Sequence, residues 1–191
     1  MATVSPGDRK DLIGLIVSDH RAAERLFAEL IAGAGDAQHR RDLADHLTTE
    51  LVRHSVAEEL YLYPAARRAL PDGDDVADRG IEEHADIERI LKDLEGVDPA
   101  DRTFDELIGR LYVDVQDHVA QEEREVLPRV QDACDADELR ELGELVARTN
   151  AAAPTRPHPS APDTPPQDLV LASGTGMIDK FRDALTGGDA R

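Results

Sequence analysis

The sequence predicts an all-α fold: an up-down-up-down four-helix bundle built from two helix-pair repeats, plus a short fifth helix and a Pro-rich C-terminal tail. Apolar residues recur every three or four positions along four segments, as on one face of a helix. Two of these segments share a histidine, three residues, Glu-Glu, four residues and a proline, at His54–Pro64 and His118–Pro128, with an offset of 64 residues. The other two match at the same offset around His20 and His84, which indicates a tandem duplication.

The first helix is expected from about Arg9 to Ala32, after a polar N-terminus. Its inward positions are Leu12, Ile16, His20, Ala23, Phe27 and Leu30. Gly33 and Gly35 are expected to end it, and Asp36 is suited to cap the next helix.

The second helix carries a stripe with steps of three or four residues. The stripe consists of Leu43, Leu47, Leu51, His54, Glu58 and Tyr61. Pro64 is expected to kink or end this helix, because proline removes an interior hydrogen bond. The segment Pro71-Asp72-Gly73 is typical of a turn.

The third and fourth helices repeat this arrangement. The third is expected from about Val76 to Leu94. The segment from Thr103 to Glu106 resembles a capping box and is expected to open the fourth. The stripe of the fourth helix is Leu107, Leu111, Val115, His118, Glu122 and Glu125, each 64 residues after its counterpart in the second.

The remaining chain divides the protein into two parts. A short fifth amphipathic helix is expected at 136–148, so the bundle domain spans residues 1–149. Residues 150–191 begin with a proline-rich stretch that is expected to be a linker or strap. A last short helix is expected at 177–185.

Composition excludes several classes of partner. The net charge is −19, from 41 acidic and 22 basic residues, so the phosphates of nucleic acid and the surface of an anionic membrane would repel the chain. The apolar run at 12–17 is too short to span a membrane, and no signal-peptide pattern precedes it. A single cysteine, Cys134, permits no internal disulfide. We therefore expect a cytoplasmic protein with no nucleic-acid and no membrane partner.

Polar residues interrupt the apolar stripes at matching positions. His54 and Glu58 do so in the second helix, and His118 and Glu122 in the fourth. A buried carboxylate is costly unless it is paired or bound to a metal, and two facing carboxylates would force one to take up a proton. A cation between them removes both difficulties.

The six candidate metal ligands include a histidine from each predicted helix. They are His20, His54, Glu58, His84, His118 and Glu122. Nitrogen and oxygen ligands without thiolate suit iron, manganese or zinc. Six side chains exceed the four ligands of a tetrahedral zinc site, and two carboxylates could bridge two metals. A dinuclear site is therefore favoured, with iron as the first candidate.

Other polar residues lie near these ligands along the same helices. Tyr61 and Glu125 lie three residues after the glutamates, so each could be a further ligand or could support the ligands. Glu24 and Glu88 lie towards the edge of their stripes, where surface or supporting roles are expected. The two remaining glutamates of the Glu-Glu pairs, at 59 and 123, fall off the stripe and are expected to be solvated.

These residues resemble the hemerythrin-like family, the HHE cation-binding domain, over about residues 10–130. The resemblance rests on Asp19-His20, His54-x-x-x-Glu58, Glu83-His84 and His118-x-x-x-Glu122. It implies a four-helix bundle holding two iron ions in a non-haem, oxo- or hydroxo-bridged di-iron centre. Glu58 and Glu122 would be the bridges, and the four histidines would be terminal ligands.

The sequence departs from oxygen-carrying hemerythrins at two ligand positions. Glu88 stands where their third helix has a second histidine, and Glu122 follows His118 at a spacing that differs from their His-x-x-x-x-Asp. Some relatives also have a glutamate where this chain has Ser55. Fewer nitrogen ligands leave open metal positions, which favours turnover over reversible oxygen carriage.

Three functions remain open on the sequence. The first is a di-iron protein that binds or reacts with a small oxidant (peroxide, dioxygen or nitric oxide), most concretely by decomposing peroxide under oxidative stress. The second is an iron- or gas-responsive sensor without turnover. The third is a metal-free helical interaction module.

Overall fold

The protein is described by a computed structural model that covers residues 10–33 and 35–152. The described part of the chain is helical throughout, with short connecting turns. Its elements are α1 (Leu12–Ile31), α2 (Ala37–Ala57), η2 (Glu58–Leu62), α3 (Tyr63–Ala69), α4 (Gly73–Leu94), α5 (Arg102–Gln121), η3 (Glu122–Val126), α6 (Leu127–Ala133) and α7 (Ala136–Ala152).

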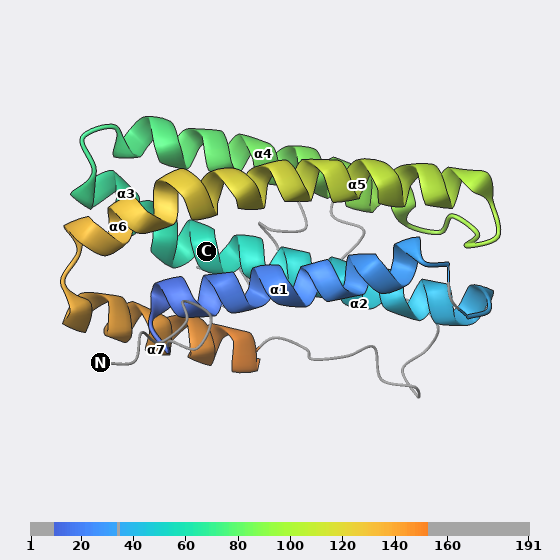
Figure 1. Ribbon diagram of the computed structural model, residues 1–191, viewed down its shortest axis with the longest axis horizontal. Helices are drawn as coiled ribbons and strands as arrows, with labels where there is room; N and C mark the ends of the chain where they lie inside the picture. The colour runs from blue at the N-terminus through green and yellow to red at the C-terminus, as the bar shows by residue number, and fades with distance from the viewer. Residues whose placement is uncertain (1–9, 34, 153–191) are drawn as a thin grey trace, which may run out of the picture.

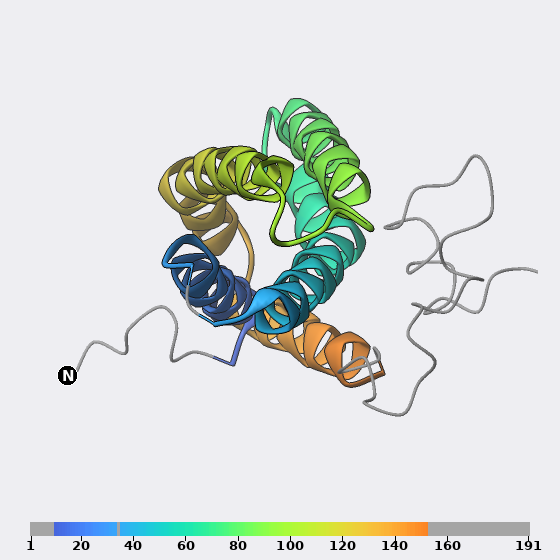
Figure 2. The same ribbon diagram turned by 90° about the vertical axis from the view of Figure 1, so that its right-hand side faces the viewer.

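The four long helices form the predicted bundle. Helices α1 and α2 form one antiparallel pair and α4 and α5 the other, and α1 packs against α5 and α2 against α4 (Figures 1 and 2). The fifth helix, α7, lies outside the bundle against α1 and α2. The all-α, up-down-up-down fold predicted from the repeat is therefore confirmed.

The apolar core consists of two clusters separated by a polar layer. One contains Phe27, Leu47, Phe104 and Leu111, and the other contains residues such as Leu62. In α1 and α4 the histidine falls between the residues of the two clusters, and in α2 and α5 it lies in the last turns, where the first cluster ends. The bundle thus buries its apolar surface at both ends and holds four imidazoles between them.

Aspartates open three of the long helices. Asp11 caps α1, and Asp36 caps α2 as predicted, by accepting a backbone N–H at 2.9 Å from Gly14 and from His39 respectively. The cap of α5 is Asp101, whose carboxylate accepts the N–H of Thr103, so the prediction of a cap at Thr103 was wrong. Asp101 lies two residues before Thr103, and its carboxylate accepts a free N–H group of the first turn. The helix therefore starts before Thr103.

Both prolines of the repeat follow a π-helical turn. Proline has no N–H for the carbonyl four residues earlier, and its ring would clash with that carbonyl in a regular α-helix. At Pro64 the preceding turn widens, and the N–H of Tyr63 bonds to the carbonyl of Glu58 five residues back. The helical path therefore continues to Ala69 instead of ending at the proline, and the second repeat does the same.

Two further helix boundaries differ from the sequence prediction. Helix α4 begins at Gly73, before the predicted start at about Val76, and α7 continues to Ala152, past the predicted end at residue 148. The Pro-rich tail from residue 153, including the helix predicted at 177–185, lies outside the described residues. None of the helices at 10–33 and 35–152 has the length and apolar character needed to cross a membrane.

Candidate metal centre

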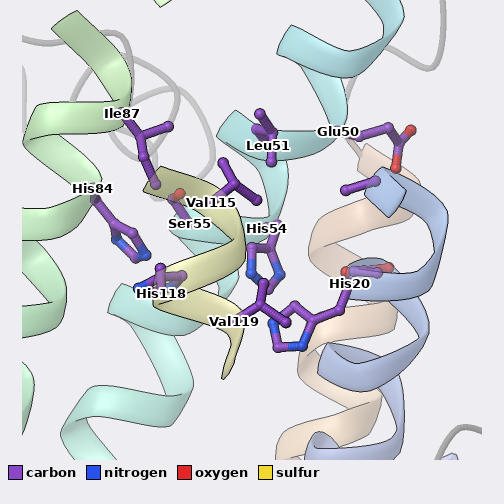
Figure 3. A pocket seen from close by; sticks show the side chains of 12 residues that line it. His20, Glu50, Leu51, His54, Ser55, His84, Ile87, Val115, His118 and Val119 are labelled. Atoms are coloured by element: carbon purple, nitrogen blue, oxygen red, sulfur yellow. The ribbon is translucent and has the colours of Figure 1, made fainter. Parts of the chain in front are cut away.

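Six buried side chains meet in the polar layer of the bundle. We call them the His/Glu cluster, which consists of His20, His54, Glu58, His84, His118 and Glu122. The four imidazoles come from α1, α2, α4 and α5 and point towards one another (Figure 3). The six residues that the stripes single out are thus brought together.

Glu58 lies at the centre of this cluster and is fully buried. Its Oε1 lies 3.2 Å from Nε2 of His54, and its Oε2 lies 3.1 Å from Nε2 of His84. Oε2 is also 3.7 Å from Nε2 of His118. The carboxylate therefore presents one oxygen to each side of the cluster.

Glu122 faces the same space from the opposite repeat. Its Oε2 lies 3.5 Å from Nε2 of His20 and 3.8 Å from Nε2 of His118. Its Oε1 accepts a hydrogen bond of 3.2 Å from the hydroxyl of Tyr63. The two glutamates therefore occupy equivalent places in the repeats but have different surroundings.

The donor atoms form two groups that could each hold a cation. One consists of His20, His54, Glu58 and Glu122, and the other of Glu58, His84 and His118, with the atoms of each group within 4.8 Å of one another. Buried atoms of the cluster lack hydrogen-bond partners in the described chain: His20 Nε2, His54 Nδ1 and Nε2, Glu58 Oε1, His118 Nε2 and Glu122 Oε2. Because unpaired buried polar atoms are costly, this donor set fits a bound cation.

The imidazoles differ in their affinity for protons. Burial alone lowers the pKa of each, because it disfavours the charged form. For His20, His84 and His118, bonds to neighbouring carboxylates outweigh burial and raise the pKa, to about 10 for His118. Burial dominates at His54 and lowers its pKa to about 3.

The two carboxylates of the cluster also differ. Burial raises the pKa of Glu58, but the charges of the surrounding imidazoles, first His54, and the hydrogen bond with His84 outweigh it, so the pKa lies well below its usual value. Burial and the charge of Glu58 raise the pKa of Glu122. This is the unequal pair expected when two carboxylates share one buried site.

Three outer carboxylates hold the imidazole rings. The Nδ1 atoms of His20, His84 and His118 lie 2.9, 3.0 and 2.7 Å from carboxylates of Glu123, Glu59 and Glu83 respectively. A neutral ring that donates its Nδ1 proton to a carboxylate keeps the lone pair of Nε2 directed at the cluster.

The expectation that Glu59 and Glu123 are solvated was therefore wrong. These glutamates lie off the stripe of their own helix, but they reach across to a histidine of the other repeat. A stripe describes one face of a single helix, so it does not predict a contact with another helix. Glu83, which directly precedes His84, reaches His118 on the neighbouring helix of its own repeat.

Tyr63 was missed by the sequence analysis. Its buried hydroxyl lies 3.2 Å from Glu122 Oε1 and 3.4 Å from His84 Nε2. The π turn at 58–62 adds a residue to the helical register, which rotates later side chains relative to a regular stripe. The second repeat has Leu127 at the equivalent position, so comparing the two repeats did not single out Tyr63 as a functional residue.

The same π turns move the two additional candidates away from the cluster. The hydroxyl of Tyr61 is 2.8 Å from Thr149 Oγ1 on α7, and Glu125 is half exposed and paired with Arg124. In the described chain neither side chain belongs to a group that could hold a cation. A ligand role for either is therefore not supported by the geometry.

The glutamates that follow the histidines of α1 and α4 lie outside the His/Glu cluster. Glu24 pairs with Arg21 at 2.9 Å on the surface. Glu88 is buried and contacts Lys92 at 3.1 Å. Glu24 thus has the expected surface position, whereas Glu88 is buried.

Comparison with known proteins gives consistent results. An uncharacterized hemerythrin-like protein of Schizosaccharomyces pombe is 28% identical over 171 residues, which cover 89% of this chain and 84% of that protein. A protein of Nostoc sp. named DNA nickase is 29% identical over 124 residues, covering 64% of this chain but only 34% of that protein. This chain thus spans about a third of the Nostoc protein's length.

A solved structure has the same fold. The crystal structure of a hemerythrin HHE cation binding domain-containing protein from Mycobacterium kansasii matches with a TM-score of 0.63 and 22% identity, covering 72% of this chain and 83% of that one. Residues 11–130 match the hemerythrin HHE cation-binding domain, and this range contains the whole His/Glu cluster. The chain therefore belongs to the hemerythrin HHE cation-binding domain family.

Proposed function

We propose that the protein is a non-haem di-iron protein that reacts with a small oxidant, most concretely by decomposing hydrogen peroxide. The observation that carries the proposal is the position of Glu58, which belongs to both groups of donor atoms. A carboxylate shared by two groups is suited to bridge two cations. A single tetrahedral zinc would use only four of the six side chains.

The donor set supports iron as the metal. Four imidazole nitrogens and two carboxylates, without a thiolate, are suited to a redox-active first-row metal. Two bound irons would supply open coordination positions and exchange electrons with the oxidant. Every other contribution comes from the chain, which positions the donor atoms, limits access and handles protons.

Proton handling falls to groups beside the cluster. Peroxide decomposition reduces one peroxide to two waters, using two protons and two electrons, and oxidises a second peroxide to dioxygen, which returns them. The hydroxyl of Tyr63 holds a proton within hydrogen-bond distance of Glu122 Oε1. That position allows it to lend a proton and recover it during the cycle.

Access to the cluster is narrow. The imidazoles adjoin a cavity whose walls include Leu51, Ile87, Val115 and Val119 (Figure 3). The cavity is large enough only for a water-sized molecule, so it excludes substrates larger than a small oxidant such as peroxide, dioxygen or nitric oxide. We propose these small oxidants as partners, with no nucleic-acid or membrane partner, in the cytoplasm.

The test is oxygen evolution after peroxide is added to the iron-loaded protein. Free iron at the same concentration and the Glu58→Ala variant are the controls. Turnover well above both supports peroxide decomposition. Turnover equal to that of free iron rejects it and leaves the binding or sensing of a gas by the same centre as the better account.

The metal-free interaction module is the third candidate. It requires the His/Glu cluster to be purely structural, although several of its buried atoms have no hydrogen-bond partner in the described residues. Protein purified from iron-replete cells without bound metal would favour it.

A further inference from the structure

The duplication predicts four equivalent contacts between an imidazole and an outer carboxylate. The contact of His20 with Glu123 joins the first repeat to the second, and the contact of His84 with Glu59 joins the second repeat to the first. The two contacts are equivalent, because His20 corresponds to His84 and Glu59 to Glu123 at the 64-residue offset. The contact of His118 with Glu83 lies within the second repeat. Its counterpart in the first repeat should join His54 to residue 19.

Residue 19 is an aspartate, and this contact is missing. Nδ1 of His54 has no hydrogen-bond partner among the described residues, and the hydrogen bonds and salt bridges of the same part of the chain include none from Asp19. Aspartate is one methylene shorter than the glutamate at the equivalent position 83. The shorter side chain leaves a gap where the second repeat has a hydrogen bond of 2.7 Å.

The gap opens onto the cavity beside the cluster. Asp19, His54 and Glu50 all line this cavity, which otherwise has mainly apolar walls. Its volume admits about one water molecule, and a buried water needs two or more polar partners. The carboxylate of Asp19 and Nδ1 of His54 are two such partners.

We propose that Asp19 is a positioning residue that orients His54 through one bridging water, in place of the direct carboxylate contact made by the other three imidazoles. His54 is then the least firmly held imidazole of the cluster. The metal position built from His20 and His54 therefore exchanges its metal faster than the position built from His84 and His118. This inference rests on the proposed pair of metal ions.

The duplication supplies a reciprocal test. Asp19→Glu adds the missing methylene to the first repeat, and Glu83→Asp removes it from the second. The rate at which each protein, loaded with two Co²⁺ ions, releases metal to a chelator is measured. Asp86→Glu, an exposed change on α4, is the control for adding a methylene.

The wild-type protein is expected to release cobalt in two phases. Asp19→Glu should slow the fast phase, and Glu83→Asp should accelerate the slow one. Asp19→Ala, which removes the carboxylate, should weaken cobalt binding at the faster position by roughly 10- to 100-fold, the usual loss when such a partner is removed. The control should change neither phase.

A second readout is independent of the metal. In the ¹⁵N-labelled, chelated protein, NMR of the imidazole nitrogens reports whether Nδ1 of His54 carries a proton and how fast that proton exchanges with water. Asp19→Glu should slow this exchange towards that of His118, and Glu83→Asp should speed exchange at His118. A change in folding alone would not produce opposite effects at two histidines.

The outcomes separate this inference from the proposed function. Failure of the wild-type chain to bind two metal ions would reject the dinuclear proposal itself. If two ions bind but Asp19→Glu and Glu83→Asp leave both release rates and both exchange rates unchanged, the dinuclear site stands and the role of Asp19 is rejected.

Discussion

Gly80 of α4 leaves the space that the hydroxyl of Tyr63 occupies. A Cβ at residue 80 would lie 2.2 Å from the hydroxyl oxygen of Tyr63, closer than real Cβ contacts come. That hydroxyl bonds to Glu122 in the His/Glu cluster. The absence of a side chain on one helix thus sets the position of a proton donor on another.

Gly80→Ala should therefore displace Tyr63 and destabilise the protein, by about 1–3 kcal/mol, the usual cost of overpacking a core. The matched control is Gly109→Ala on α5, where a Cβ would meet nothing within 4 Å. It should stabilise the helix by roughly 0.5–1 kcal/mol, because alanine restricts the unfolded chain more than glycine does. Chemical denaturation measures both, and equal effects would contradict the packing argument.

Tyr63→Phe should lower peroxide turnover more than it lowers metal content. The change removes the O–H that bonds to Glu122 and keeps the ring that packs against Gly80. Loss of a general acid–base group typically costs about 10²- to 10⁴-fold in rate. Iron content and initial rate are measured on the same sample.

The control is Tyr61→Phe, which removes a hydroxyl bonded to Thr149 on α7. It should leave turnover unchanged and cost only about 1 kcal/mol of stability, as for an ordinary hydrogen bond. If Tyr61→Phe lowered turnover as much as Tyr63→Phe, the assignment of the proton donor would be wrong.

The protein should bind about two irons per chain, because two donor groups share Glu58. Glu58→Ala and Glu122→Ala should each lose at least one iron, as metal analysis of the purified variants will determine. Glu24→Ala and Glu88→Ala should retain both. Loss of iron from Glu88→Ala would make that residue a ligand, in the place where oxygen-carrying hemerythrins have histidine.

Metal binding should release protons at pH 7. In the chelated chain the pKa of His118 is about 10, so its ring is protonated at neutral pH and must lose that proton to bind a cation. His54, with a pKa of about 3, is already neutral and releases none. Affinity should therefore rise with pH below about 10, by roughly tenfold per unit for each proton released. Calorimetry in buffers of different ionisation enthalpy measures the number of protons, and zero would contradict the prediction.

The same raised pKa affects the stability of the chelated protein. A histidine whose folded pKa lies above its unfolded value stabilises the fold most fully below the unfolded pKa, near 6.5, and this contribution disappears as the pH rises through the folded pKa of about 10. Stability of the chelated chain should therefore fall between these values. His118→Asn should flatten this part of the profile, as urea denaturation at several pH values will test.

Removing the metal should also lower the melting temperature at pH 7. A ligand that binds only the folded state stabilises it by about 2.7 kcal/mol at a free concentration of 100 times its Kd. Scanning calorimetry of the same sample before and after chelation measures the shift. An unchanged melting temperature would mean that the cations bind outside the buried layer.

The sequence by itself determined the four long helices, their pairing and the six residues of the His/Glu cluster. Helical periodicity places His54 and Glu58 on one face, and the repeat at 64 residues places His118 and Glu122 on the matching face. These are regularities within one helix and between copies of it, so they can be recognised without coordinates.

Only the tertiary structure decided which residues support that cluster. Glu59, Glu123 and Tyr63 reach residues of other helices, across the bundle, and a π turn shifts the register that a regular stripe assumes. The contact between Asp19 on α1 and His54 on α2 is likewise missing because the side chain of aspartate is one methylene shorter than that of glutamate. Spacing along a helix specifies which face a side chain occupies, whereas the reach of that side chain to another helix depends on how the helices pack.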